Sequence, residues 1–212
     1  EFEERLLGPG FPSASCFNGM VVPRGHGVRV SVDDLKVYYY TLERRPKQGR
    51  NCVGSSFAYE ELSQALPAEL LPDKALSPSG RFRIQLLVHG MGDKNASDVG
   101  QGTHVGMLRQ GGCMLPSESI FYKHPPPRGS TWEGVYQDDH GVLQVCPLMC
   151  LNRKCGLRDE WINARSGEIY RGAGVVLQED KVERLRSDAT VWGSDIAGRE
   201  PQVSWAEAKR VS

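Results

Sequence analysis

Two apolar stretches that flank an acidic tip are the feature that most constrains the fold of this 212-residue chain. Residues 132–145 read Trp-Glu-Gly-Val-Tyr-Gln-Asp-Asp-His-Gly-Val-Leu-Gln-Val. Apolar runs separated by turn-favouring residues are typical of a β-hairpin, so we expect a hairpin over Glu133–Val145 with the Asp-Asp-His-Gly segment at its tip. An Asp pair at a tip can be an ordinary polar turn, because Asp favours turns. Whether the Asp pair has a chemical role depends on which residues lie beside it.

A second stretch, Val28–Val32, alternates apolar and polar residues and predicts a strand that ends at Asp33 and Asp34. Nucleotidyl transfer by a two-metal mechanism needs carboxylates that hold two divalent cations about 3.5–4 Å apart. One Asp at a strand end and an Asp pair on a neighbouring hairpin present such carboxylates rigidly. We therefore expect Asp34, Asp138 and Asp139 to converge, with Asp33 as the rival of Asp34.

The rest of the chain predicts an α+β fold, because strands and helices interleave without a βαβ rhythm. The other expected elements are an irregular segment over 1–27, a helix over Phe57–Leu71 interrupted by Pro67, a strand or buried helix start over Phe82–Val88, a helix over Asp93–Arg109, a polar loop over 152–170, a charged helix around Glu179–Arg186 and a strand over Thr190–Trp192.

In this order the residues resemble the palm region of reverse transcriptases, in a divergent form of the retrotransposon type. Asp34, followed five positions later by Tyr39, resembles the first palm motif, and Tyr136-Gln137-Asp138-Asp139 resembles the Tyr-x-Asp-Asp box. Residues 91–96, with Gln101 and His104, resemble a divergent second motif that lacks the usual Pro-Gln-Gly. Residues 172–174 followed by Lys181 resemble the fourth motif, and residues 191–198 resemble the short hairpin that follows the palm.

The resemblance implies an RNA-directed DNA polymerase that uses Mg²⁺ or Mn²⁺. Its metal-binding and catalytic residues would be Asp34, Asp138 and Asp139, and its nucleotide-binding residues would be Tyr39, Gly92, Gln101 and Lys181. Tyr39 would exclude a 2′ hydroxyl by its volume, and Lys181 could donate a proton to the leaving pyrophosphate. The implied partners are an RNA or DNA template-primer and deoxynucleotides.

The same resemblance implies a palm-like antiparallel sheet with helices packed on one face and truncated fingers. We expect the fingers remnant in residues 1–27, the palm domain in 28–200 and a tail in 201–212. The chain opens at Glu1 without an initiating Met, which favours a piece of a longer polyprotein with further domains.

The charge balance argues against a self-sufficient nucleic-acid binder, because 26 basic and 26 acidic side chains cancel. We expect other segments of a longer protein to supply much of the template grip. No apolar run is long enough to span a bilayer, so we expect no membrane association. Six cysteines are too few and too unevenly spaced for a disulfide scaffold, which favours a reducing, intracellular compartment such as cytoplasm or nucleus. We interpret Cys146, Cys150 and Cys155 as buried free thiols, because they lack a Cys-x2-Cys pair.

Two other functions stay open from the sequence. The missing fingers and zero net charge are also typical of a decayed polymerase remnant that serves as a binding or structural module. An ADP-ribosyltransferase-like enzyme is the second alternative, since Val88-His89-Gly90 and residues 108–112 resemble the nicotinamide-pocket strand and helix of that group. The second alternative leaves the Asp-Asp hairpin unexplained.

Overall fold

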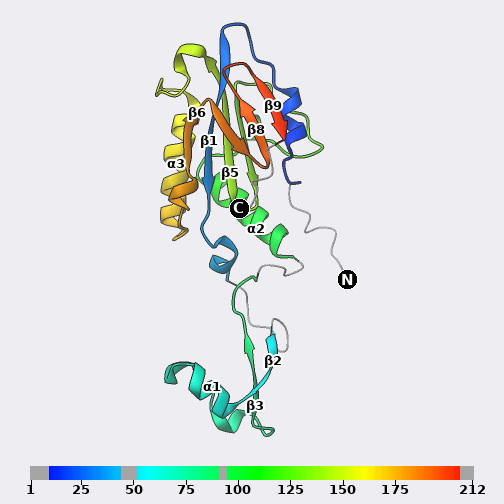
Figure 1. The fold of residues 1–212 in the computed structure, drawn as a ribbon, viewed down its shortest axis with the longest axis vertical. Coiled ribbons are helices and arrows are strands. Elements are labelled where there is room, and N and C mark those ends of the chain that lie inside the picture. The colour runs from blue at the N-terminus through cyan, green and yellow to red at the C-terminus, as the bar shows by residue number, and fades with distance from the viewer. Residues whose placement is uncertain (1–9, 44–51, 91–94, 206–212) are drawn as a thin grey trace, which may run out of the picture. The chain divides into compact units, whose positions relative to one another are not determined.

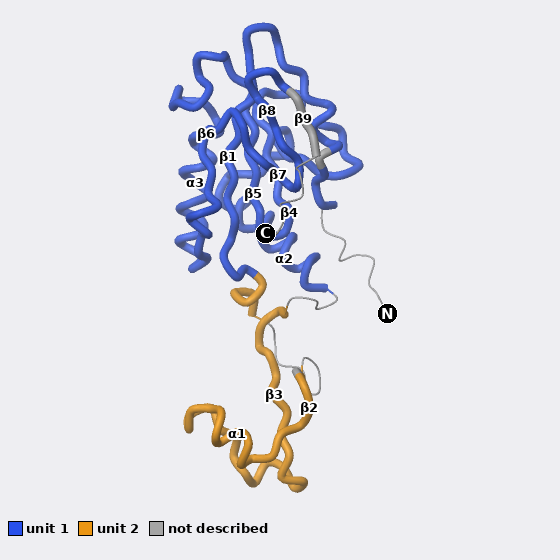
Figure 2. The backbone as a smooth tube through the Cα atoms, in the orientation of Figure 1, with its two compact units in different colours: residues 1–38, 94–212 blue, residues 39–93 orange. Residues whose placement is uncertain are grey.

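The protein divides into two compact units in the computed structural model, which describes residues 10–43, 52–90 and 95–205. The larger unit comprises residues 1–38 and 94–212, and the smaller unit comprises residues 39–93 (Figure 2). Both units combine helices with antiparallel strands, so the predicted α+β class is confirmed. None of the helices within the described ranges is long and apolar enough to cross a membrane.

A four-stranded antiparallel sheet forms the centre of the larger unit (Figure 1). Its strands, in spatial order, are β4 (Thr131–Tyr136), β5 (Asp139–Pro147), β1 (His26–Asp34) and β6 (Glu183–Arg186). Strands β1 and β5 pair without a register shift from His26 and Pro147 at one end to Asp34 and Asp139 at the other. The predicted hairpin and its position beside the Val28–Val32 strand are therefore confirmed.

Two helices cover one face of this sheet, α2 (Ala96–Gln110) and α3 (Arg158–Gly172). Polar contacts hold both helices on that face: Gln101 of α2 donates to a backbone carbonyl of β4, and Asn163 of α3 donates to the Ser31 hydroxyl of β1. Because side chains alternate along a strand, the neighbouring residues of β1 and β5 point to the opposite face.

The opposite face carries an apolar core beneath a smaller antiparallel sheet. That sheet consists of β7 (Asp188–Val191), β8 (Ser194–Ala197) and β9 (Gln202–Trp205), and the 3-10 helix η2 (Ala14–Gly19) lies at the same core. The buried members of the core are Phe17, Val28, Val30, Ile120, Trp132, Leu143, Val145, Ala189, Val191 and Ile196.

A tight turn at Trp192 and Gly193 joins β7 to β8, and both residues have positive φ angles of 46° and 75°. The Trp192 indole packs over the register pair Gly134 and Gly141 of β4 and β5. A Cβ atom built on Gly134 would lie 2.5 Å from the Trp192 ring, so a larger residue there would displace the indole. The predicted strand at Thr190–Trp192 is thus present in part, with Trp192 in the turn.

Two expectations from the sequence were wrong. The predicted polar loop over 152–170 contains α3, and the predicted charged helix around Glu179–Arg186 is a single 3-10 turn, η7 (Glu179–Lys181), followed by strand β6. Helix α3 buries Asp159 and Ser166 beside Ile162 and Tyr170, so half of its buried residues are polar. The sequence therefore lacks the regular helical spacing of apolar residues that would have predicted this helix. Pairing with β1 keeps Glu183–Arg186 extended.

The smaller unit contains a two-stranded ribbon and one short α-helix. Strand β2 (Cys52–Ala58) pairs with β3 (Arg81–Gln85), and α1 spans Tyr59–Ala65. The predicted helix over Phe57–Leu71 is therefore confirmed only in its middle, and it ends just before Pro67, which cannot continue a helix. The remaining 3-10 turns are η3 (Tyr38–Thr41), η4 (Ala68–Leu70) and η5 (Lys74–Leu76) in this part of the chain, and η6 (Leu148–Cys150) in the larger unit.

A buried ion pair fastens α3 to the far end of β1. The Arg29 guanidinium donates to both carboxylate oxygens of Asp159, at 2.8 and 2.6 Å, and both side chains are almost completely buried. Glu160 accepts a third hydrogen bond at 2.8 Å. A buried charge that loses its partner is strongly destabilising, so this contact makes the docking of α3 depend on charge pairing.

Replacing Asp159 with Ala should lower the free energy of unfolding of the larger unit by about 3–5 kcal/mol, because it leaves the Arg29 guanidinium buried without its bidentate partner. Urea unfolding followed by tryptophan fluorescence measures this, since all four Trp residues belong to the larger unit. Glu168→Ala, which removes an exposed ion pair with Arg165, is the matched control and should cost less than about 0.5 kcal/mol. Equal losses in the two variants would contradict the assignment.

Candidate functional site

Three carboxylates meet at one corner of the four-stranded sheet. Asp34 is the last residue of β1, Asp139 is the first residue of β5, and the two are register partners. The Leu35 N–H donates to the carbonyl oxygen of Asp138 at 3.0 Å, which ties the third residue to the same corner. Facing Cα atoms in an antiparallel pair lie about 4.5–5.5 Å apart, so the side chains of Asp34 and Asp139 are neighbours.

Crowding at this corner raises the proton affinity of two of the carboxyl groups, Asp138 and Asp139. Burial and the nearby charges of Asp138 and Asp34 raise the pKa of Asp139 from its ordinary 3.8 to about 7. Burial and the charge of Asp34 also raise the pKa of Asp138. Crowded, half-buried carboxylates that repel one another form a site whose charge a cation would relieve.

Lys181 is the cation that neutralises Asp34 in this structure. Its Nζ atom lies 2.8 Å from Asp34 Oδ2, and this hydrogen bond raises the pKa of the Lys181 ammonium. Carboxylate oxygens are the ligands that Mg²⁺ and Mn²⁺ prefer, so the chemistry of the donors fits either ion. Within residues 10–43, 52–90 and 95–205, however, no three His, Cys, Asp or Glu side chains already stand together as a metal cluster. A divalent ion at this corner would compete with Lys181 for Asp34.

The turn of the hairpin lies earlier than the sequence predicted. Tyr136 pairs with Asp139, so the turn consists of Gln137 and Asp138, whereas His140 and Gly141 already belong to β5. Gln137 adopts a positive φ of 57°, which a residue other than Gly or Asn rarely takes without support. The Asp-Asp-His-Gly tip was therefore wrong by two residues.

Helix α2 supplies the support for this turn. The Gln101 side chain donates to the Val135 carbonyl at 2.6 Å and accepts from the Gln137 N–H at 2.7 Å. His104 Nδ1 lies 2.8 Å from the Gln137 carbonyl, to which it can only donate, and its Nε2 lies 2.8 Å from the Tyr170 hydroxyl. Burial and the neighbouring His140 lower the pKa of His104 to about 3, so the imidazole is neutral. Both side chains hold the backbone that presents the Asp pair.

The sheet places the side chains of Asp33 and Asp34 on opposite faces. Asp33 points to the helix-covered face, where it contacts His140, Arg184 and Ser166 and is almost completely buried. Burial alone would raise the pKa of Asp33, but the hydrogen bond and charge of His140, with those of Arg184, hold that pKa below its ordinary value. Asp34, partly exposed and paired with Asp139, is the carboxylate at the corner.

The predicted nucleotide-binding residues have separate locations. Lys181 joins the corner, Gln101 lies buried under the hairpin, and Gly92 falls outside the described residues. Tyr39 is buried in η3 and belongs to the smaller unit, so its contact with a nucleotide stays a prediction. The turn that must precede it is present: Val37 has a positive φ of 48°, directly before η3.

Three residues that the sequence analysis did not assign to the site are Glu133, His140 and Arg184. His140 was expected only as part of the hairpin tip, yet it is fully buried between two carboxylates, Glu133 at 2.9 Å and Asp33 at 3.4 Å. Burial would lower the pKa of His140, but these two hydrogen bonds raise it above its ordinary value. A correct position for the turn would have placed His140 on the face opposite to Asp139 and marked it as a buried polar residue.

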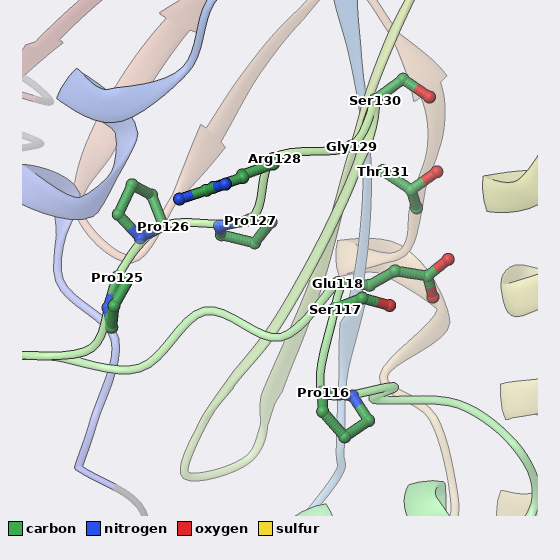
Figure 3. A pocket seen from close by; sticks show the side chains of 10 residues that line it. All are labelled: Pro116, Ser117, Glu118, Pro125, Pro126, Pro127, Arg128, Gly129, Ser130 and Thr131. Atoms are coloured by element: carbon green, nitrogen blue, oxygen red, sulfur yellow. The ribbon is translucent and has the colours of Figure 1, made fainter.

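Two other features of the larger unit lie apart from the corner. A groove of about 450 Å³ is lined by residues 116–118 and 125–131 (Figure 3), and it adjoins the first residue of β4, at the end of that strand away from Tyr136. Cys146, Cys150 and Cys155 are free thiols, as predicted. Cys146 and Cys150 are also buried as predicted, whereas Cys155 is exposed, so its predicted burial was wrong.

No protein-family model matches the chain, and no curated protein matches it significantly.

Replacing Asp139 with Asn should stabilise the metal-free protein at about pH 8 and change little near pH 4. The folded-state pKa of Asp139, about 7, exceeds its ordinary 3.8. The stability that this carboxyl contributes is therefore complete below about pH 4 and is lost as the pH rises towards about 7. Asn keeps the shape and never ionises. Because the carboxyl is partly exposed, we expect a gain of roughly 1–2 kcal/mol at the higher pH.

Urea unfolding at the two pH values measures this difference. Asp188→Asn, an exposed position on β7, is the matched control and should show no gain. A variant at position 139 that is no more stable than the parent at the higher pH would contradict the crowding of the three carboxylates.

Proposed function

We propose that this chain carries the palm core of an RNA-directed DNA polymerase of the reverse-transcriptase type, with Asp34, Asp138 and Asp139 as its metal-binding carboxylates. The single observation that supports this proposal most is the register pairing of Asp34 with Asp139 at one corner of the sheet. That pairing joins a strand-end Asp to an Asp pair on a hairpin from a segment about a hundred residues away. Two-metal nucleotidyl transfer requires this kind of convergence.

Each residue of the corner has a part in the proposed reaction. Two bound divalent ions would activate the primer 3′ hydroxyl and stabilise the leaving pyrophosphate. Asp34 and Asp139 would hold the ions from two adjacent strands, and Asp138 would add a carboxylate from the turn. Lys181, whose ammonium lies at this corner, would donate a proton to the leaving pyrophosphate.

Sugar selection is assigned to Tyr39. The positive φ of Val37 breaks the strand after Asp34, so Tyr39 does not follow the simple alternation that would put it on the face opposite to Asp34. An aromatic ring under the sugar excludes a 2′ hydroxyl by its volume. Tyr38 is less suited to this part, because its hydroxyl donates to the Gly100 carbonyl inside the larger unit.

A second candidate function is a catalytically decayed polymerase remnant that acts as a binding or structural module. The observation that favours it is the Lys181–Asp34 ion pair, which neutralises one of the proposed ligands, together with the zero net charge of the chain. The two candidates differ in whether divalent cations bind at the corner and in whether a primer is extended.

Replacing Asp138 with Asn should reduce deoxynucleotide incorporation by roughly a hundredfold or more, because the amide keeps the size of the side chain and removes the charge that a metal ion needs. Primer extension on an RNA template measures this. Asp188→Asn is the matched control and should retain the parent rate. Activity within about tenfold of the parent in the Asp138 variant would assign the chemistry to another site.

Shrinking Tyr39 to Ala should raise ribonucleotide incorporation relative to deoxynucleotide incorporation by about tenfold or more, because the discrimination is steric and is lost with the ring. The ratio of the two incorporation efficiencies measures this. Tyr40→Ala, at the exposed neighbouring position, is the control and should leave the ratio unchanged. An unchanged ratio in the Tyr39 variant, with both efficiencies intact, would show that Tyr39 only packs.

A further inference from the structure

Four charged side chains form one line of contacts across the sheet, with one residue from each strand. Glu133 Oε1 of β4 lies 2.9 Å from His140 Nε2 of β5, and His140 Nδ1 lies 3.4 Å from Asp33 Oδ2 of β1. Arg184 of β6 donates from Nη2 to Asp33 Oδ1 at 2.5 Å. The residues follow the spatial order β4-β5-β1-β6, and we call this line the cross-strand ladder.

The ladder is almost entirely closed to solvent. The side chains of Glu133, His140 and Asp33 are at most 1% exposed, and only Arg184, at 34%, reaches the surface. Two anchors fix it from outside the sheet: the Met114 N–H donates to Glu133 Oε2 at 2.6 Å, and Ser166 Oγ of α3 lies 3.1 Å from Asp33 Oδ2. Buried charges are tolerated only when each keeps its partner, so the ladder strongly disfavours any arrangement that separates them.

The contacts of the ladder require the observed register of β5 against β1. Asp33 and His140 are register partners on the helix-covered face. A slip of one residue would move His140 to the apolar face and leave Asp33 without it, because strand side chains alternate. The same register brings Asp34 beside Asp139, although these two carboxylates repel each other.

The ladder residues are close in sequence to the residues of the candidate site. Asp33 directly precedes Asp34, and His140 directly follows Asp139. Arg184 also donates from Nη1 to the Val32 carbonyl at 2.9 Å, and it follows Lys181 by three residues. The ladder thus holds β1, β5 and the segment that carries Lys181 at their ends nearest the corner.

We propose that Glu133, His140, Asp33 and Arg184 are positioning residues that hold the Asp34–Asp139 corner together against the repulsion of its own carboxylates. The structural part of this proposal rests on the contacts alone. Its consequence for metal binding rests on the proposed function, and the two are measured separately.

The test compares His140→Gln with Val145→Ala in the full chain. The His140→Gln substitution would leave Asp33 and Glu133 buried without the cation between them, whereas Val145 lies on the same strand in the apolar core, away from the ladder. Amide hydrogen exchange of the metal-free protein is the first measurement. Leu35 and Gln178, whose N–H groups donate to Asp138 and Asp34, report on the corner, and Val28, bonded to Gly198, reports on the far end of β1.

We expect His140→Gln to speed exchange at Leu35 and Gln178 on the order of tenfold more than at Val28. Val145→Ala should change the three amides by similar factors or favour the far end. Equal loss of protection at the corner in both variants would overturn the proposal. The same would follow if His140→Gln left the corner amides unchanged.

Mn²⁺ titration followed by electron paramagnetic resonance is the second measurement. His140→Gln should raise the Kd for Mn²⁺ on the order of tenfold or more, and Val145→Ala should leave it near the parent value. If the parent itself bound no Mn²⁺, the proposed function would fail, whereas selective loss of corner protection in the first measurement would still support the positioning role.

Ser166→Ala keeps the test decisive if His140→Gln does not fold. It removes one hydroxyl contact to Asp33 and leaves all four ladder charges in place. We expect a smaller but still local loss of protection at Leu35 and Gln178, of a few fold. Unchanged exchange at both amides in this variant would overturn the proposal.

Discussion

The unbroken nine-residue register between β1 and β5 is the constraint on which the rest of the larger unit depends. It sends alternate residues of both strands to two different environments. One set, which includes Val28, Val30 and Leu143, builds the apolar core beneath the smaller sheet. The other set includes Arg29, Ser31 and Asp33 of β1, whose side chains bond to α3, beginning with the Arg29–Asp159 ion pair at one end. The register ends at the pair Asp34 and Asp139. The same strand pairing therefore determines both the fold of the larger unit and the position of the candidate site.

The two faces of the sheet end in opposite electrostatic arrangements near the corner. On the helix-covered face, Asp33 is matched by His140 and Arg184, and its carboxyl keeps a low pKa despite burial. On the other face, Asp139 lies among carboxylates and its pKa rises to about 7. Matched charges on the helix-covered face thus lie directly behind crowded carboxylates on the other face, where Lys181 pairs with Asp34. A divalent cation would complete the second face as His140 completes the first.

The sequence predicted those parts of the fold that local patterns encode. The alternation in Val28–Val32 and around the Asp pair was enough for β1 and the hairpin, whereas their convergence was expected from the two-metal requirement. The position of the turn was not predictable, because the positive φ of Gln137 depends on Gln101 and His104 from α2, far away in sequence. Helix α3 was missed because it buries Asp159 and Ser166 as well as apolar residues. The choice between Asp33 and Asp34 needed the register, which decides the face each one takes.

The most direct test of a two-metal polymerase corner is the anomalous diffraction of Mn²⁺ in crystals of the protein with a template-primer and an incoming deoxynucleotide. The account predicts two manganese peaks about 3.5–4 Å apart, both within coordination distance of Asp34, Asp138 or Asp139, with the Lys181 ammonium displaced from Asp34 Oδ2. Crystals that hold the nucleotide but show no manganese at these carboxylates, with Lys181 still bound to Asp34, would contradict it.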